Sequence, residues 1–140
     1  LDLAIQQSVA GNRIGDIGYA VQQHAEVNHH YGVIREMVGQ GIGKKLHEPP
    51  EVPNYGKRGK GPMLHEGLTI AIEPMINFGT REVVLKKDGW TLTTRDLKPS
   101  AHYEHTIAIQ KSAADVLSDH KVIDQAIKNN VNLSEVWIKR

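Results

Sequence analysis

The stretch TIAIEPMI, residues 69–76, decides the fold, and a single carboxylate, Glu73, interrupts its otherwise apolar run. Period-two alternation predicts a strand that places Ala71 and Glu73 on one face and the flanking isoleucines on the other. Pro74 has no backbone N–H to give to a ladder, so the strand should end or reach a sheet edge there. A charge in such a run is costly to bury unless it is paired or binds a cation. A strand-end glutamate turned to water fits the same residues.

A second strand, HYEHTIAIQ at residues 102–110, repeats this arrangement. Alternation places Glu104 on one face with Thr106 and Ala108, and the isoleucines on the other. Each strand therefore presents one carboxylate among small side chains, which leave room for an ion or a substrate. Two such carboxylates could hold a cation between them or act as the acid and base of a glycoside hydrolase, and the spacing does not choose between these.

The remaining elements predict an α+β protein with helices first and strands later. Hairpin-joined strands favour an antiparallel sheet with the helices on one face. Asp88-Gly89 is a strong hairpin turn signal. The expected helices are 1–10, about 14–28 and 122–128, the expected strands are 31–35, 69–76, 83–85, 90–94 and 102–110, and residues 38–62 are expected to form a long loop.

Composition allows one domain with one hydrophobic core, since the chain has 140 residues, of which 39% are apolar and 24% charged. The chain has no cysteine, which excludes disulfides, thiolate metal sites and a cysteine nucleophile. A net charge of +1 gives no electrostatic reason to expect nucleic acid or an anionic membrane as a partner. No apolar run approaches the roughly 20 residues of a membrane span. The chain starts at Leu1 inside an expected helix, which indicates a fragment.

A glycine-rich segment, GQGIGKKLHEPP at residues 39–50, allows close approach of the backbone to a neighbour. Val38 and Lys45 break the phosphate-binding P-loop pattern, and Lys44 breaks the dinucleotide pattern. His47-Glu48 lacks the second histidine of the zinc-protease helix motif. On spacing alone, a lone loop histidine is more often structural than catalytic.

Taken together, these segments resemble type I methionine aminopeptidases. The resemblance covers residues 1 to about 110 and implies the C-terminal half of a pita-bread fold. In that fold a curved antiparallel sheet carries helices on its outer face and a two-metal site on its inner face. It implies an enzyme that removes the initiator methionine. The matching stretches are GQGIGKKLHEPPEVPNYG (39–56), IEPMI (72–76), KDGWT (87–91) and SAHYEHTI (100–107).

The resemblance also implies roles for individual residues. Glu73 matches a metal ligand that lies beside the attacking water, and Glu104 matches a glutamate that bridges two metals. His47 matches the histidine that contacts the scissile amide and stabilises the tetrahedral intermediate. Trp90 and Leu46 match positions that line the substrate cleft and the methionine pocket.

Cofactor, partners and location follow from the same resemblance. It implies two divalent ions, of cobalt, manganese, iron or zinc, and peptide substrates that begin with methionine. It implies a cytoplasmic protein and allows association with the ribosome. No nucleic-acid or membrane partner is expected.

The chain departs from the family pattern at Gln40, because the family has Gly-His-Gly where this sequence has Gly39-Gln40-Gly41. A glutamine oxygen is a weaker, neutral donor than imidazole, so we expect weaker binding at one metal position. A natural loss, an engineered change and a non-catalytic pita-bread binding module are all consistent with this residue. Proline-specific peptidases and creatinase-like enzymes fit the glycine-rich segment less well.

The family also takes two aspartate ligands and a further histidine from an N-terminal half. We expect residues 1–140 to be the C-terminal part of a single catalytic domain, with that N-terminal half absent. Asp2 and Asp16 lie in expected helices and are poor substitutes for the missing ligands.

Overall fold

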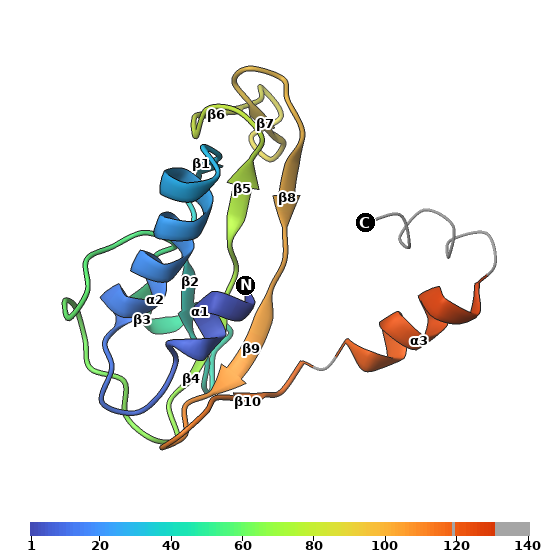
Figure 1. Ribbon diagram of the computed structural model, residues 1–140. Coiled ribbons are helices and arrows are strands. Elements are labelled where there is room, and N and C mark those ends of the chain that lie inside the picture. Colours follow the sequence, from blue (N-terminus) through green and yellow to red (C-terminus); the bar gives the residue numbers. More distant parts are fainter. Residues whose placement is uncertain (119, 131–140) are drawn as a thin grey trace.

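The structure, a computed structural model, describes residues 1–118 and 120–130 and confirms the α+β expectation (Figure 1). Helices α1 (Asp2–Gln6) and α2 (Ile14–Gln22) lie together on one side of the strands, and a π-helical segment, η1 (Gln23–Asn28), continues α2. Helix α3 (Lys121–Asn129) follows the last strand and extends away from the body. Within the described residues, no helix is long and apolar enough to cross a membrane.

In the part of the chain that the structure describes, three antiparallel sheets make up the strand layer. The first has five strands in the order β10-β9-β4-β2-β3, the second has three in the order β1-β5-β8, and the third is the β6-β7 hairpin. The strands are β1 (Gly32–Val33), β2 (Gly39–Gly41), β3 (Glu48–Val52), β4 (Thr69–Ile72), β5 (Met75–Asn77), β6 (Val83–Leu85), β7 (Leu92–Thr94), β8 (Ser100–His102), β9 (His105–Ala108) and β10 (Asp115–Val116).

The core lies between the helices and the five-stranded sheet. Ile17 and Val21 of α2 point inward because three- and four-residue spacing brings them onto one face of the helix. Ile70 and Ile107 pair directly across β4 and β9, and both are fully buried. Full burial of each such side chain contributes about 1.5–3 kcal/mol. The core therefore fixes which face of β4 and β9 turns toward the helices and which face is left for polar groups.

The prediction of a long loop at residues 38–62 is wrong in two places, because strands β2 and β3 form within that segment. Gly39 and Gly41 carry no side-chain signal for a strand, yet both need to be glycine here. A Cβ at Gly39 would collide with the Ala71 carbonyl oxygen, and one at Gly41 with the Pro49 carbonyl oxygen. These glycines allow β2 to fit between β3 and β4.

The other expected elements are present with changed bounds. Helix 1–10 ends at Gln6, and Val9 instead forms a bridge with Gln110. Expected strand 31–35 shortens to β1, and the helix expected at 122–128 is present as α3. Expected strand 90–94 starts at Leu92, because the Asp88 carboxylate accepts the Trp90 and Thr91 backbone N–H groups in the turn.

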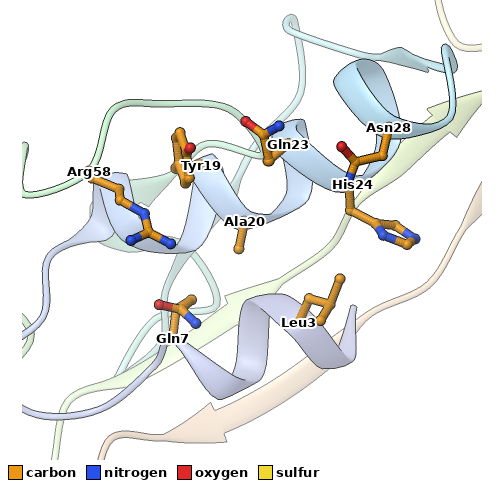
Figure 2. Close-up of a pocket in the computed structure, with 8 residues that line it drawn as sticks. All are labelled: Leu3, Gln7, Tyr19, Ala20, Gln23, His24, Asn28 and Arg58. Atoms are coloured by element: carbon orange, nitrogen blue, oxygen red, sulfur yellow. The ribbon is translucent and has the colours of Figure 1, made fainter.

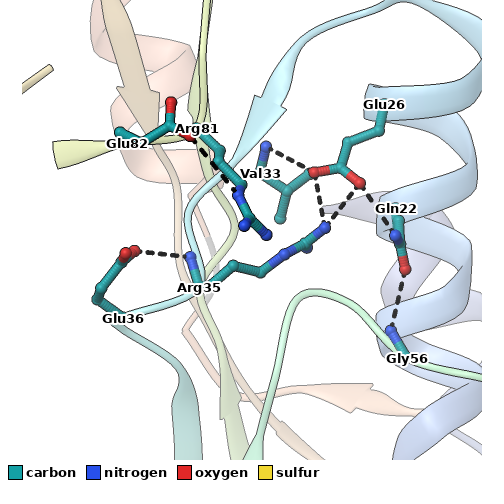
Figure 3. Close-up of polar contacts among 8 residues, drawn as sticks. All are labelled: Gln22, Glu26, Val33, Arg35, Glu36, Gly56, Arg81 and Glu82. Atoms are coloured by element: carbon teal, nitrogen blue, oxygen red, sulfur yellow. Dashed lines mark hydrogen bonds and ion pairs between the residues drawn. The ribbon is translucent and has the colours of Figure 1, made fainter. Parts of the chain in front are cut away.

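A partly buried polar network ties η1 to β1 and to the segment after β3 (Figure 3). The Arg35 guanidinium donates to both Glu26 carboxylate oxygens at 2.8 and 2.7 Å, and the Val33 N–H donates to the same carboxylate at 3.3 Å. Gln22 links this carboxylate to the Gly56 N–H. The Arg35 guanidinium also lies 4.4 Å from the centre of the Tyr55 ring. The network fixes the helices relative to β1, which pairs with β5.

Candidate metal site between the sheets

The two carboxylates singled out by the sequence lie where two strand pairs break. The β4–β9 ladder ends at Ile72 opposite His105, and the β5–β8 ladder resumes at Met75 opposite His102. The same register runs through both ladders, so Glu73 lies opposite Glu104 in the gap. The single strands expected at 69–76 and 102–110 are each split in two by this gap.

Pro74 explains the break. It offers no N–H to the ladder, as expected, and its carbonyl accepts the Tyr103 N–H at a long 3.5 Å. The Glu73 carbonyl is instead satisfied by the Asn54 side-chain amide at 3.1 Å. Asn54 is itself buried, at 1% exposed. It therefore holds the Glu73 backbone in place where the ladder no longer does.

Three potential ligand side chains converge in the gap. Glu73, His102 and Glu104 each offer one donor atom, and these atoms lie within 4.8 Å of one another. His102 Nε2 is 3.4 Å from Glu73 Oε2. The Glu73 side chain is 16% exposed and that of His102 49%, and Glu104 is exposed. Two carboxylates and an imidazole form a donor set suited to borderline divalent ions, so the residues present fit the metals that the sequence resemblance implies.

The electrostatics of the gap favour a cation. Burial raises the pKa of the Glu73 carboxyl, and the Glu104 charge raises it further, while His102 and His47 act in the opposite direction. Two facing carboxylates oppose each other's ionisation, and a bound cation removes that penalty.

Gln40 lies in β2 on the face that carries Glu73. Gly41 pairs with Ile70, so the same antiparallel register brings Gln40 opposite Ala71, two residues before Glu73. The residue at the family's histidine position therefore points toward the side of the sheet that bears the carboxylates. In strand order, β2 and β9 flank β4 on opposite sides.

The three expected substrate residues lie on exposed segments that connect strands. Leu46, 68% exposed, and His47 lie between β2 and β3, where Glu48 accepts the Lys45 N–H at 2.7 Å. Trp90 lies in the β6–β7 turn and is 88% exposed. Its backbone N–H donates to the Asp88 carboxylate at 3.0 Å within the same turn. The structure therefore brings Glu73 and Glu104 together and leaves Trp90 at the periphery.

Sequence reasoning missed His102 and Asn54. His102 precedes Glu104 by two residues, so alternation alone would have placed it on the same side. Asn54 gave no local signal, because its role depends on contact with a carbonyl far along the chain.

A shallow pocket elsewhere does not involve these residues. It has a volume of about 220 Å³ and lies between α1 and α2 (Figure 2). Arg58 covers the Tyr19 ring at one end, with 4.9 Å from its guanidinium carbon to the ring centre. The lining residues are Leu3, Gln7, Tyr19, Ala20, Gln23, His24, Asn28 and Arg58, with neither glutamate among them.

Comparison with known proteins identifies relatives. Residues 1–111 match metallopeptidase family M24. The methionine aminopeptidase of Clostridium acetobutylicum is 46% identical over 114 residues, which are 81% of this chain and 45% of that protein. Methionine aminopeptidase A of Synechocystis sp. is 49% identical over 118 residues, covering 84% of this chain and 46% of that protein. The chain thus spans about half the length of the curated relatives it matches.

Solved structures agree. The methionine aminopeptidase of Thermotoga maritima superposes with a TM-score of 0.81 at 44% identity, covering 85% of this chain and 47% of that one. That of Rickettsia prowazekii has a TM-score of 0.79 at 45% identity, covering 82% and 46%. The prolidase of Pyrococcus furiosus, at 20% identity and a TM-score of 0.58 over 84% of this chain and 29% of that one, shares the fold alone. The expected pita-bread fold is confirmed.

Proposed function

Because the chain belongs to metallopeptidase family M24, we propose that it forms the C-terminal half of a metallo-aminopeptidase that removes the initiator methionine from nascent polypeptides. The observation that carries the proposal is the convergence of Glu73 and Glu104 in the gap between two strand pairs. The similarity to methionine aminopeptidases supports it. In this proposal an N-terminal half supplies the remaining ligands, and the reaction takes place in the cytoplasm.

Each residue has a proposed role in the reaction. Glu73 and Glu104 hold two divalent ions, with the Gln40 amide oxygen as a neutral third donor. Bound ions supply an activated water and positive charge beside the scissile carbonyl. Glu73, whose carboxylate is largely shielded, accepts the proton of the attacking water. His47 donates a hydrogen bond to the substrate amide, and Leu46 and Trp90 line the cleft for the methionine side chain.

Cleavage of the peptide Met-Ala-Ser tests this function. The protein assayed is the polypeptide in which residues 1–140 follow the sequence encoded before Leu1, supplied with Mn²⁺ or Co²⁺. Glu73→Gln should reduce kcat by at least about 100-fold, because it removes both a ligand and the proton acceptor. The matched control is Glu66→Gln, a surface carboxylate that faces Lys111 at 3.7 Å. Equal loss in both variants, or none in Glu73→Gln, would contradict the proposal.

Gln40 favours a second candidate, a non-catalytic binding module that keeps the fold. A neutral amide occupies the position where the family has a metal-binding imidazole, so one metal position is weakened. If the enzyme proposal holds, Gln40→His raises the rate of cleavage at limiting metal. Metal binding without cleavage in both the original and the Gln40→His protein would favour the binding module.

A further inference from the structure

We propose that His102 is a metal ligand that supplies, from β8, the imidazole that the chain lacks at Gln40 on β2. This inference rests on the proposed function, because it concerns the same metal site. It adds a ligand that the sequence resemblance does not assign to this chain.

The donor geometry suits a shared cation. Zinc–nitrogen and zinc–oxygen bonds are about 2.0–2.2 Å, so two ligands at a tetrahedral angle have donor atoms about 3.4 Å apart. His102 Nε2 and Glu73 Oε2 are 3.4 Å apart. The Glu104 donor lies within 4.8 Å of both, and its exposed side chain can rotate inward.

The same distance is long for a charge-assisted hydrogen bond between His102 and Glu73. Charge-assisted N–H···O bonds are about 2.7–2.9 Å long, and the Arg35–Glu26 pair of this protein reaches 2.7 Å. His102 is about half exposed, and exposed ion pairs add little to the stability of a fold. A contribution to the stability of the fold therefore gives little reason for a histidine at position 102.

The topology explains how one residue can replace the other. Glu73 follows β4, which lies between β2 and β9 in the five-stranded sheet. Gln40 approaches this position from β2. His102 approaches from the opposite side, where β8 continues the line of β9 and pairs Met75 with His102. Moving the imidazole from one side of Glu73 to the other keeps a nitrogen ligand beside the same carboxylate.

Co²⁺ titration of the protein tests the assignment, because the visible absorption of Co²⁺ reports both affinity and ligand type. His102→Gln should raise the Kd for Co²⁺ by at least about tenfold, the lower end of the loss seen when even supporting groups of a metal site are removed. It should also shift the absorption bands. His65→Gln, at an exposed histidine elsewhere on the chain, is the matched control and should change neither.

Two further measurements keep the test decisive. Proton NMR of the Co²⁺-loaded wild type should show a strongly shifted, exchangeable imidazole N–H, a readout that needs no variant. Gln40→His should lower the Kd more in the His102→Gln background than in the wild type, because each residue can supply the nitrogen ligand.

The outcomes separate the two proposals. An unchanged Kd and spectrum in His102→Gln, or equal effects of Gln40→His in both backgrounds, overturns the role of His102 and leaves the proposed function standing. Failure of the wild type to bind Co²⁺ overturns both.

Discussion

Removing the Glu104 charge should stabilise the metal-free protein, although the residue belongs to the candidate site. In Glu104→Gln the repulsion between the two facing carboxylates is lost. Their donor atoms lie within 4.8 Å of each other, and at that separation Coulomb's law gives about 0.9 kcal/mol in water and about 3.5 kcal/mol at an effective dielectric constant of 20. Glu104 is exposed, so we expect a gain near the lower figure, about 1 kcal/mol at pH 7.

The pH dependence of stability should agree with this gain in sign. The pKa of Glu73 is raised in the folded state, so its ionisation opposes folding as pH rises above the ordinary value of 4.5. Glu104→Gln removes one cause of that rise. The stabilisation should therefore be present at pH 7, fade as pH falls through the raised pKa of Glu73, and be gone below 4.5, where Glu73 is protonated in the folded and unfolded chains alike.

Urea unfolding followed by far-UV circular dichroism, in EDTA and low salt, measures the effect. Raising the salt concentration should reduce it, since the charges face solvent. Mn²⁺ at 100 times the wild-type Kd should stabilise the wild type by about 2.7 kcal/mol and the variant by less, which reverses their order. Glu66→Gln serves as the control and should give no gain. A metal-free Glu104→Gln protein that is less stable than the wild type would refute the reasoning.

Three further predictions follow from single contacts. Asn54→Ala should lower the free energy of unfolding by about 1–3 kcal/mol in urea titrations, because the partly buried Glu73 carbonyl loses its donor, and a loss under 0.5 kcal/mol would contradict this. Ile107→Ala should lower it by about 2–5 kcal/mol through a core cavity, and a change within experimental error would show that β9 is not packed as described. Asp88→Asn should abolish the acid sensitivity of the β6–β7 turn seen in amide NMR shifts. Hydrogen bonds from Thr91 hold the pKa of Asp88 below 3.8, so its contribution is present above that pH and lost as pH falls through the lowered pKa, and an unchanged acid response in the variant would exclude this carboxylate as its source.

Rules that use only neighbouring residues predicted the strands that have a strong alternating pattern. They did not predict how those strands pair. Period-two alternation placed Glu73 and Glu104 on definite faces, and the missing N–H of Pro74 predicted where the first strand ends. To predict that Glu73 and Glu104 lie directly across from each other, the register between the two strands must be known. That register depends on side-chain packing between Ile70 and Ile107.

Strands β2 and β3 could not be predicted, because glycine and proline have low strand propensity and the reason for them lies in distant residues. Gly39 is needed only because the Ala71 carbonyl lies against it. The part played by Asn54 was hidden for the same reason. The site was therefore predictable in its carboxylates and unpredictable in the residues that position them.

The measurement that tests the central claim most directly is Mn²⁺ binding, followed by electron paramagnetic resonance of the free ion, in the wild type and in the Glu73→Gln, Glu104→Gln double variant. The account predicts saturable binding by the wild type and at least a 100-fold higher Kd in the double variant, which keeps the fold by circular dichroism. Equal binding by both proteins, or none by the wild type, would contradict a metal site between these strands.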